Sequence, residues 1–479
     1  MMKRKKIVLA LVAAGLCAGA LPAHAAAGDA DRIAQLEKQL KMLQEQVEAM
    51  KKSAATSQEV ADLRDQVTAQ GKEAVVAGDI PNSFRIPGSD TSIHLYGIAE
   101  MNMIREFKGD NGNNDYSTFA PYIPLRGSTL ASRKGETYLT GRTSRIGIEG
   151  ATPTPYGVAM VKIEGDFAND PRTGNSQLNG KLGNIQTQQG TNSYDFRLRH
   201  AYLQVGPWLF GQTWSTFMDV DNTPETVDFN GPIGSTFIRQ PQIRYTYATP
   251  QYGNFSAALE NSVSYVLRSS DWSASTDGFS KSPDFIVRWD KPYNWGSMSL
   301  RAVSHELRVQ GALGDQSRRG YGLAASGQIK TVGDDFISWI VTGGNGIGRY
   351  FNYIEGAAYN SATNTIEMEK VLGLVLGYQH KVSDQLRFNF VYGTQKSYNS
   401  GYTDLAIASG YGGSVTQNGS DQGQFGVNRR VSQLHIGGIY NPVKVVDIGL
   451  EYIYGKRETL LGEKGDMSRV NFLARYNFN

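Results

Sequence analysis

The sequence is almost free of cysteine and has few long apolar runs. One cysteine, Cys17, occurs among 479 residues. The chain beyond residue 25 therefore contains no disulfide bond and no thiolate metal site. A membrane-spanning helix needs about 20 consecutive apolar residues, and no such run follows the N-terminal segment. The mean hydropathy is negative. Together these absences exclude a helical membrane protein.

The first 25 residues have the pattern of an export signal. Basic residues at positions 3–6 precede an apolar segment, 7–16, and Ala23-His24-Ala25 offers the small residues of a cleavage site. A lipoprotein signal acylated at Cys17 is the alternative, but a leucine stands before it where a small residue is expected. The excess of 48 Lys and Arg over 45 Asp and Glu lies in this segment. We therefore expect no nucleic-acid partner for the mature chain.

Residues 26–70 have the heptad periodicity of an α-helical coiled coil. Apolar residues recur at alternating spacings of three and four, with charged residues on the other faces. These positions are Ile33, Leu36, Leu40, Leu43, Val47 and Met50. The alternative is one amphipathic helix lying on a larger unit. We expect a short periplasmic coiled coil that joins subunits, three-stranded if the protein is a trimer, and a linker at 71–91.

From residue 92 onward the periodicity changes to that of β-strands. In the last twelve residues, 468–479, apolar and polar side chains alternate. One face carries Val470, Phe472, Ala474, Tyr476 and Phe478, and the other carries Arg469, Asn471, Leu473, Arg475 and Asn477. Successive side chains of a strand point to opposite sides, so this pattern predicts lipid on one face and water on the other.

The same alternation recurs in sixteen segments. Their centres lie near Leu95, Ile146, Val161, Leu198, Phe210, Ile243, Ala257, Val287, Leu300, Leu323, Trp339, Leu374, Phe388, Ile436, Leu450 and Phe472. Seven connections are short and rich in turn-forming residues. The eight long, polar connections are 105–141, 168–193, 215–238, 263–282, 308–320, 343–370, 397–430 and 456–467.

This sorting of connections is typical of outer-membrane barrels, with periplasmic turns on one rim and extracellular loops on the other. A soluble β-sandwich would not sort its connections in this way. We expect an all-β transmembrane β-barrel of about 16 antiparallel strands over residues 92–479. Sixteen strands leave a lumen that side chains cannot fill, so we also expect a water channel.

Arginines at alternating positions are the main candidates for functional side chains. An arginine on the lipid face near the bilayer centre costs about 2–4 kcal/mol, which favours the inward orientation. The lumen arginines predicted in this way are Arg145, Arg197, Arg199, Arg244, Arg288, Arg301, Arg387 and Arg475. Each could instead be a wall residue paired with a nearby acid. As a set, they predict a pore lined with guanidinium groups, whose forked donors suit carboxylates and phosphates.

The third long connection, 215–238, differs from the others in composition. It combines apolar residues and prolines with four acids, Asp219, Asp221, Glu225 and Asp228. Loops of this mixed content tend to fold onto other parts of a protein. We expect this loop to fold into the barrel and narrow it, with its acids facing wall arginines. A solvated surface loop is the alternative.

Several stretches between residues 84 and 250 resemble one family specifically. They are 141–145 (GRTSR), 196–202 (FRLRHAY), 211–219 (GQTWSTFMD), 224–231 (PETVDFNG) and 239–245 (RQPQIRY). These stretches resemble the DcaP-like porins of Gram-negative bacteria. The resemblance implies a homotrimer of sixteen-stranded barrels in the outer membrane that passes small anions such as dicarboxylates. It also implies that Arg239 joins Arg145, Arg197, Arg199 and Arg244 near the narrow part of the pore.

Other chemistry has little support in the sequence. The glycine cluster 343–348 has no helix after it, so it does not predict a phosphate-binding loop. We expect no enzyme activity, no cofactor and no metal site. Two functions are compared below. The first is a passive diffusion channel for small anionic solutes. The alternative is a structural outer-membrane anchor whose coiled coil tethers the membrane to periplasmic partners.

Overall fold

The computed structural model describes residues 36–45, 48, 64–65, 76–109, 115–169, 194–311, 314–351, 356–413, 421 and 423–478. By its internal contacts the chain divides into two units, Met1–Ala74 and Val75–Asn479. No helix among these described residues is long and apolar enough to cross a membrane.

In the first unit, residues 36–45 are helical. The heptad residues Leu36, Leu40 and Leu43 lie in this helix and are 64%, 61% and 56% exposed. Ile33, Val47 and Met50 lie outside the described residues, as does the export signal at 1–25. The coiled coil therefore stays a prediction.

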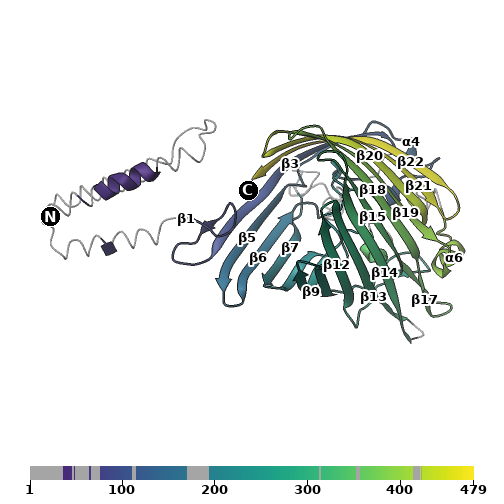
Figure 1. Ribbon diagram of the computed structural model, residues 1–479. Coiled ribbons are helices and arrows are strands. Elements are labelled where there is room, and N and C mark those ends of the chain that lie inside the picture. Colours follow the sequence, from purple (N-terminus) through teal and green to yellow (C-terminus); the bar gives the residue numbers. More distant parts are fainter. Residues whose placement is uncertain are drawn as a thin grey trace, which may run out of the picture. The chain divides into compact units, whose positions relative to one another are not determined.

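The second unit is a closed antiparallel β-barrel (Figure 1). Within the described residues, sixteen strands pair in chain order, and the ring closes where the last strand pairs with the first. The strands are β3 (Ser92–Lys108), β5 (Arg145–Thr154), β6 (Gly157–Asp166), β7 (Arg197–Val205), β8 (Trp208–Trp214), β9 (Arg239–Thr249), β10 (Gly253–Glu260), β12 (Asp284–Tyr293), β13 (Gly296–Gly311), β14 (Gly314–Lys330), β15 (Phe336–Asn345), β18 (Lys370–Lys381), β19 (Leu386–Tyr398), β20 (Asn428–Val443), β21 (Val446–Thr459) and β22 (Lys464–Phe478). All sixteen predicted centres lie within these strands, so this prediction is confirmed.

Smaller elements lie in the connections. Within the expected linker, β1 and β2 pair with each other, and β2 also pairs with β3. A three-stranded sheet joins two long loops through β11, β16 and β17. The short elements are β1 (Val76–Ala77), β2 (Phe84–Arg85), β4 (Thr137–Thr140), β11 (Leu267–Arg268), β16 (Ala357–Asn360), β17 (Thr365–Met368), α4 (Thr129–Ser132), α6 (Gly401–Ala408), η2 (Ala120–Tyr122) and η4 (Gly348–Tyr350). Several of the long connections thus contain short strands or helices within their described residues.

Two of the predicted long loops are wrong. β13 and β14 pair without interruption from Gly296 opposite Ile329 to Gly311 opposite Gly314, through the predicted loop 308–320. β21 and β22 likewise pair through most of the predicted loop 456–467. The apolar alternation marks only the part of a strand that faces lipid. Where a hairpin continues into water, its sequence becomes polar and is mistaken for a loop.

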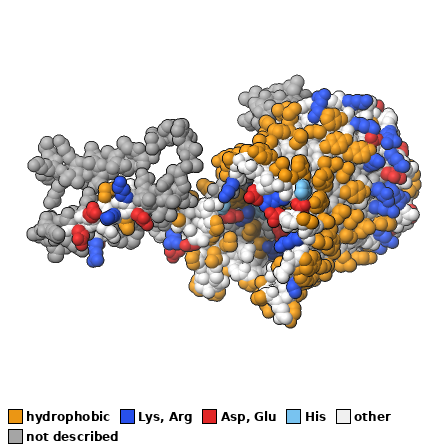
Figure 2. Space-filling model, turned by 45° about the horizontal axis from the view of Figure 1, so that its top comes forward, with side chains coloured by type: hydrophobic (Ala, Val, Ile, Leu, Met, Phe, Trp, Pro, Cys, Tyr) orange, Lys and Arg blue, Asp and Glu red, His pale blue; other side chains and the backbone are white. Residues whose placement is uncertain are grey.

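Exposure alternates along the strands as the sequence predicts. On β6, Val161 and Ile163 are 45% and 49% exposed, whereas Glu164 and Asp166 are 4% and 0% exposed. The same alternation holds along β22. Figure 2 shows the resulting hydrophobic band on the outside of the barrel, and an opening lined by charged side chains. The polar faces therefore line the lumen.

Part of the inner wall is apolar and is covered by loops. Ile286, Val303 and Val371 have the inward parity on their strands and are buried. Phe217 and Tyr350, from two different long loops, pack into the same cluster. Full burial of such a side chain stabilises by about 1.5–3 kcal/mol. This apolar patch gives the loops a physical reason to fold inward.

Candidate functional site

The segment between β8 and β9, residues 215–238, runs along the inner wall of β12–β22. The backbone N–H of Asp228 donates to Glu451 Oε1 on β21 at 3.0 Å. The backbone N–H of Ile233 donates to Gln433 Oε1 on β20, also at 3.0 Å. Both acceptor side chains are buried and have the inward parity of their strands. The segment therefore lies inside the barrel along this stretch, where it reduces the open part of the lumen.

Asp219 fixes the first part of this segment to β12, β13 and β14. Its carboxylate lies 3.4 Å from Arg288 Nη2 and 3.9 Å from Arg301 Nη1, and it accepts hydrogen bonds from Asn222 and Ser326. The side chains of Asp219 and Arg301 are fully buried. Burial alone would raise the pKa of Asp219, but the two arginines and the hydrogen bonds hold that pKa below its ordinary value. The carboxylate is therefore charged at neutral pH.

Glu225 and Asp228 hold the middle of the segment in the same way. Arg387 on β19 donates two hydrogen bonds of 2.7 Å to the Glu225 carboxylate, one to each oxygen. Arg469 on β22 lies 3.2 Å from Asp228 and 3.1 Å from Glu106. Such bidentate and fully buried pairs are among the stronger ionic contacts of proteins. The carboxylates of this segment thus act mainly as anchors.

Asp221 is the exception among the four acids. Its backbone carbonyl accepts a hydrogen bond from Gln328, but its side chain is exposed. Its carboxylate has no hydrogen bond or ion pair with the residues that the structure describes. It therefore contributes charge and no attachment.

The opposite wall carries a group of arginines that we name the arginine cluster: Arg145, Arg197, Arg199 and Arg239. Arg197 holds Asp166 through two hydrogen bonds of 2.9 and 2.8 Å. Arg199 bridges Glu164 and Asp166 at 2.7 and 2.8 Å. Arg145 lies 3.5 Å from Glu164. Three arginines of the cluster therefore share two carboxylates.

Arg239 is the fourth member and has no carboxylate partner among the described residues. Its guanidinium lies over the Trp214 ring, 3.4 Å from the centroid. Its Nε is buried without a hydrogen-bond partner in the described part of the chain. The charges acting on it most strongly are those of the other three arginines. In the described structure, the cluster thus places four guanidinium groups around two carboxylates, an excess of two positive charges.

The remaining predicted arginines lie apart from this cluster. Arg244 is half-buried on β9 and has no ion pair within the described ranges. Arg475 pairs with Glu100 at 2.6 Å and lies 3.5 Å from Asp447, near the turn end of β22. The nine predicted positions are therefore distributed over the wall, and four of them come together.

Three further arginines in the barrel interior, Arg142, Arg349 and Arg457, escaped the sequence prediction, and a fourth, Arg469, was placed on the water face of 468–479 but not among the candidate site residues. Arg142 is buried beside Asp115, between the Tyr116 and Tyr194 rings. Arg349 donates to Gln240, and Arg457 donates to loop carbonyls. Arg142 and Arg349 lie in loops, where alternation gives no signal. Arg457 lies on a polar strand face, so the same parity rule would have selected it as well.

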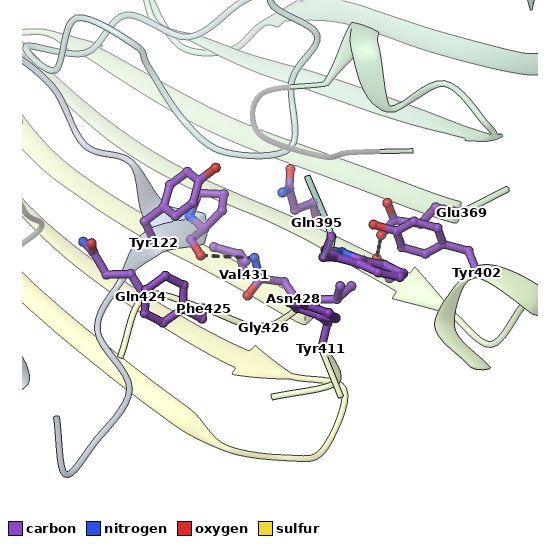
Figure 3. Close-up of a pocket in the computed structure, with 14 residues that line it drawn as sticks. Tyr122, Glu369, Gln395, Tyr402, Tyr411, Gln424, Phe425, Gly426, Asn428 and Val431 are labelled. Carbon is purple, nitrogen blue, oxygen red and sulfur yellow. Dashed lines mark hydrogen bonds between the residues drawn. The ribbon is translucent and has the colours of Figure 1, made fainter. Parts of the chain in front are cut away.

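A separate pocket lies at the long-loop end of β19 and β20. It has a volume of about 220 Å³ and is lined by loop residues and by Gln395 and Val431 of the inner wall. Figure 3 shows the rings of Tyr122, Tyr402 and Tyr411 around it. One lining residue, Glu369, is acidic, and none of those described is basic. The charge balance of this pocket is therefore opposite to that of the arginine cluster.

Comparison with known proteins identifies the family. The model of the DcaP outer membrane protein family matches residues 22–478. The crystal structure of the outer membrane channel DcaP of Acinetobacter baumannii is 25% identical, with a TM-score of 0.67, and covers 84% of this chain and 100% of that chain. Salmonella typhi OmpF in complex with daunomycin is 12% identical, with a TM-score of 0.47, over 81% of this chain and 98% of that chain.

Pseudomonas putida OprB, in its high-pH structure, is 11% identical, with a TM-score of 0.46, over 81% of this chain and 94% of that chain. No curated protein matches this chain. The family match extends over nearly the whole length, and it agrees with the closed barrel and its polar lumen. The chain therefore belongs to the DcaP outer membrane protein family and is an outer-membrane channel.

Proposed function

We propose that the protein is a passive diffusion channel that prefers small anions, with dicarboxylates as the solute class. The observation that carries this proposal is the charge excess of the arginine cluster. Low-dielectric walls focus the field of such a cluster and raise the local concentration of counter-ions. Guanidinium groups also present paired donors that match a carboxylate. A solute with two carboxylates can engage two members of the cluster in turn.

The position of segment 215–238 supports a size limit at the same level of the pore. Phe229 of this segment faces the cluster: the guanidinium carbons of Arg197 and Arg199 lie 5.7 and 5.9 Å from its ring centroid. The anchoring carboxylates of the segment are paired with arginines of the β12–β22 wall. The segment therefore affects the pore mainly by narrowing it. In this proposal the segment determines the width of the constriction, and the arginine cluster determines whether the constriction prefers anions or cations.

Reversal potentials of purified protein in planar bilayers under a KCl gradient test the proposal. The wild type should prefer chloride, and Arg239→Gln should lower that preference because it removes the cation without a carboxylate. Arg105→Gln, an equal charge change at an exposed position on β3, is the matched control and should leave selectivity unchanged. Cation selectivity of the wild type, or equal effects of both variants, would contradict the proposal.

A panel of solutes then tests the solute class. Succinate should reduce the single-channel chloride current at lower concentrations than acetate, because only succinate offers two carboxylates. The difference should shrink in Arg239→Gln. Equal reduction by both acids in the wild type would leave the anion preference in place and would exclude dicarboxylates as a favoured class.

We also propose that three chains associate and that the N-terminal segment forms a coiled coil in the periplasm. The exposed Leu36, Leu40 and Leu43 on one helix support this, because an uncovered apolar seam favours association. Deletion of residues 26–83 should reduce the trimer fraction in light scattering and leave single-channel selectivity intact. Loss of envelope integrity with intact trimers would favour the alternative, a structural anchor.

A further inference from the structure

A second group of cations lies on the outside of the barrel. It occupies the long-loop end of strands β18–β22, and we name it the outer basic belt. Its members are Lys370, Lys396, Arg429, Arg430, Lys456 and Lys464. On these strands the even-numbered residues face outward: Val371, Val431 and Arg457 are at most 4% exposed, whereas Lys370 and Arg430 are exposed. The belt therefore faces the surroundings of the barrel and contributes nothing to the lumen.

The strand register places one pair of like charges side by side on the outer face. Lys396 on β19 is directly opposite Arg430 on β20. Arg430 is in turn opposite Glu458, and Glu458 is opposite Lys464. Like charges directly opposite each other destabilise a sheet. None of the six cations forms an ion pair with any residue that the structure describes.

A β-bulge increases the local charge further. The register between β20 and β21 shifts between Asn428 and Arg430, so that Arg429 is an extra residue in its strand. Bulges re-aim side chains and commonly lie beside functional sites. Arg429 donates a hydrogen bond of 2.5 Å to the Asn399 side chain, which holds the guanidinium beside Lys396 and Lys370 in one surface groove. The bulge thus adds a third cation to this groove.

Two grooves accompany the belt. The first, of about 830 Å³, is lined by Lys370, Lys396 and Arg429 together with Tyr321 and Tyr398. The second, of about 490 Å³, is lined by the cations Arg430, Lys456, Lys464 and Arg126 and by one acid, Glu458, with Tyr392, Leu434 and Tyr454 on its apolar side. Each groove therefore combines at least three cations with tyrosine rings. This combination suits a ligand with an anionic head and an apolar body.

The level of the belt on the barrel indicates where that ligand lies. On β18, the exposed Leu372, Leu374 and Leu376 form an apolar outer face. Lys370 lies next to this face, at the end of the strand that joins the long loop. On β19, Phe388, Phe390 and Tyr392 form the same band below Lys396. The long loops of an outer-membrane barrel are extracellular. The belt therefore lies at the headgroup level of the outer leaflet, and Figure 2 shows Lys and Arg side chains beyond the hydrophobic band at that end.

Strands β5, β7 and β10 lack this feature. At the same end of β5, β7 and β10, the outward residues described include Ile146, Leu198 and Leu259, which are 54%, 44% and 48% exposed. Arginines at that end of β5 and β7 point into the lumen instead. Insertion into a bilayer therefore does not require a belt of cations, and the belt marks one side of the barrel.

We propose that the outer basic belt binds the phosphate groups of an anionic lipid of the outer leaflet, whose acyl chains lie along the tyrosines and leucines below. Phosphate neutralises the opposed Lys396 and Arg430, and arginine binds it in a forked geometry. A basic residue near an anionic lipid surface contributes about 1 kcal/mol. Several such residues in two adjacent grooves give a specific site for a headgroup with more than one phosphate.

Native mass spectrometry of the purified protein with added lipid A tests this site. The double variant Lys396→Gln/Arg430→Gln should bind diphosphorylated lipid A at least about tenfold more weakly than wild type, because two cations are removed. The matched control is Arg318→Gln/Arg319→Gln, which removes two exposed arginines from the β13–β14 hairpin outside the belt. It should bind as the wild type does. Unchanged reversal potentials in both variants confirm that the barrel is folded.

Headgroup dephosphorylation provides the second arm. Lipid A without phosphates should lose most of its binding to the wild type and should no longer distinguish the variants. If the dephosphorylated lipid bound as tightly as the diphosphorylated form, or if the belt variant retained wild-type binding, the belt would not be a phosphate site. Loss of binding in the control variant as well would show nonspecific attraction and would also overturn the proposal.

Discussion

The two sides of the lumen use arginine in opposite ways. On the β12–β22 side, Arg288, Arg301, Arg387 and Arg469 face the five described carboxylates of Asp219, Asp290, Glu225, Asp228 and Glu106. On the β5–β9 side, three arginines of the arginine cluster share two described carboxylates, and the fourth, Arg239, has no described carboxylate partner. The ratio of carboxylates to guanidinium groups thus separates arginines that attach a loop from arginines that leave an excess of positive charge on the wall.

Breaking the attachment should have the largest effect. Asp219→Asn removes the carboxylate from the buried Arg301 and from Arg288, and loss of one partner of a buried pair costs about 3–5 kcal/mol. We expect a lower free energy of unfolding in urea and a larger, noisier single-channel conductance as segment 215–238 detaches. Asp221→Asn, two residues away and exposed, is the control. A variant with unchanged conductance would show that Asp219 does not hold the segment.

Acid should reproduce part of this effect in the wild type. The pKa of Asp219 is held below its ordinary value, so its contribution to stability is present above the unfolded-state pKa of about 3.9 and is lost as the pH falls through the folded-state value. Conductance should therefore rise below about pH 4. Asp219→Asn should lack this component of the rise. An identical pH profile in wild type and variant would assign the transition to other acids.

A substitution on the β5–β9 side, which carries the arginine cluster, should change ion selectivity rather than conductance. Glu164→Gln removes one of the two carboxylates there and leaves Arg199 paired with Asp166. Removing one charge about 8 Å from a passing ion changes its energy by about 0.5 kcal/mol in water, so anion preference should rise about twofold. Reversal potentials measure this change. A fall in anion preference would mean that Glu164 does not face the conducting path.

The smallest effect on selectivity is expected from a double variant on the β12–β22 side that leaves the net charge unchanged. The double variant Glu225→Gln/Arg387→Gln removes one charge of each sign and keeps side-chain hydrogen bonding possible. Selectivity should stay at the wild-type value, and each single variant should shift it in the opposite direction to the other. A shift in the double variant as large as that of Arg239→Gln would remove the distinction between the two sides.

The sequence was sufficient for the barrel because lipid and water impose alternation on every strand. The alternation of Val161 and Lys162, for example, can be recognised within one strand, without knowing which strands lie beside it. Ion pairs are different, because Arg469 meets Asp228 across 241 positions of the chain. Such a contact depends on the path of a loop, which the sequence does not specify.

One unused signal in the sequence concerned the inner wall. Phe285, Ile286 and Val287 form a continuous apolar run in β12, and Ile286 has inward parity. An apolar run without alternation indicates a strand that is covered on both faces. It could have located the inner patch on which Phe217 packs. Which acid of the segment pairs with which wall arginine would still have been unknown.

The pairing of β22 with β3 has a consequence for biogenesis. Until the final strand has been synthesised, both β3 and β21 present open edges whose amide and carbonyl groups can pair with any other chain. Assembly therefore depends on the last fifteen residues of the described barrel, Lys464–Phe478. Deletion of these fifteen residues would leave both edges open and yield material prone to aggregation.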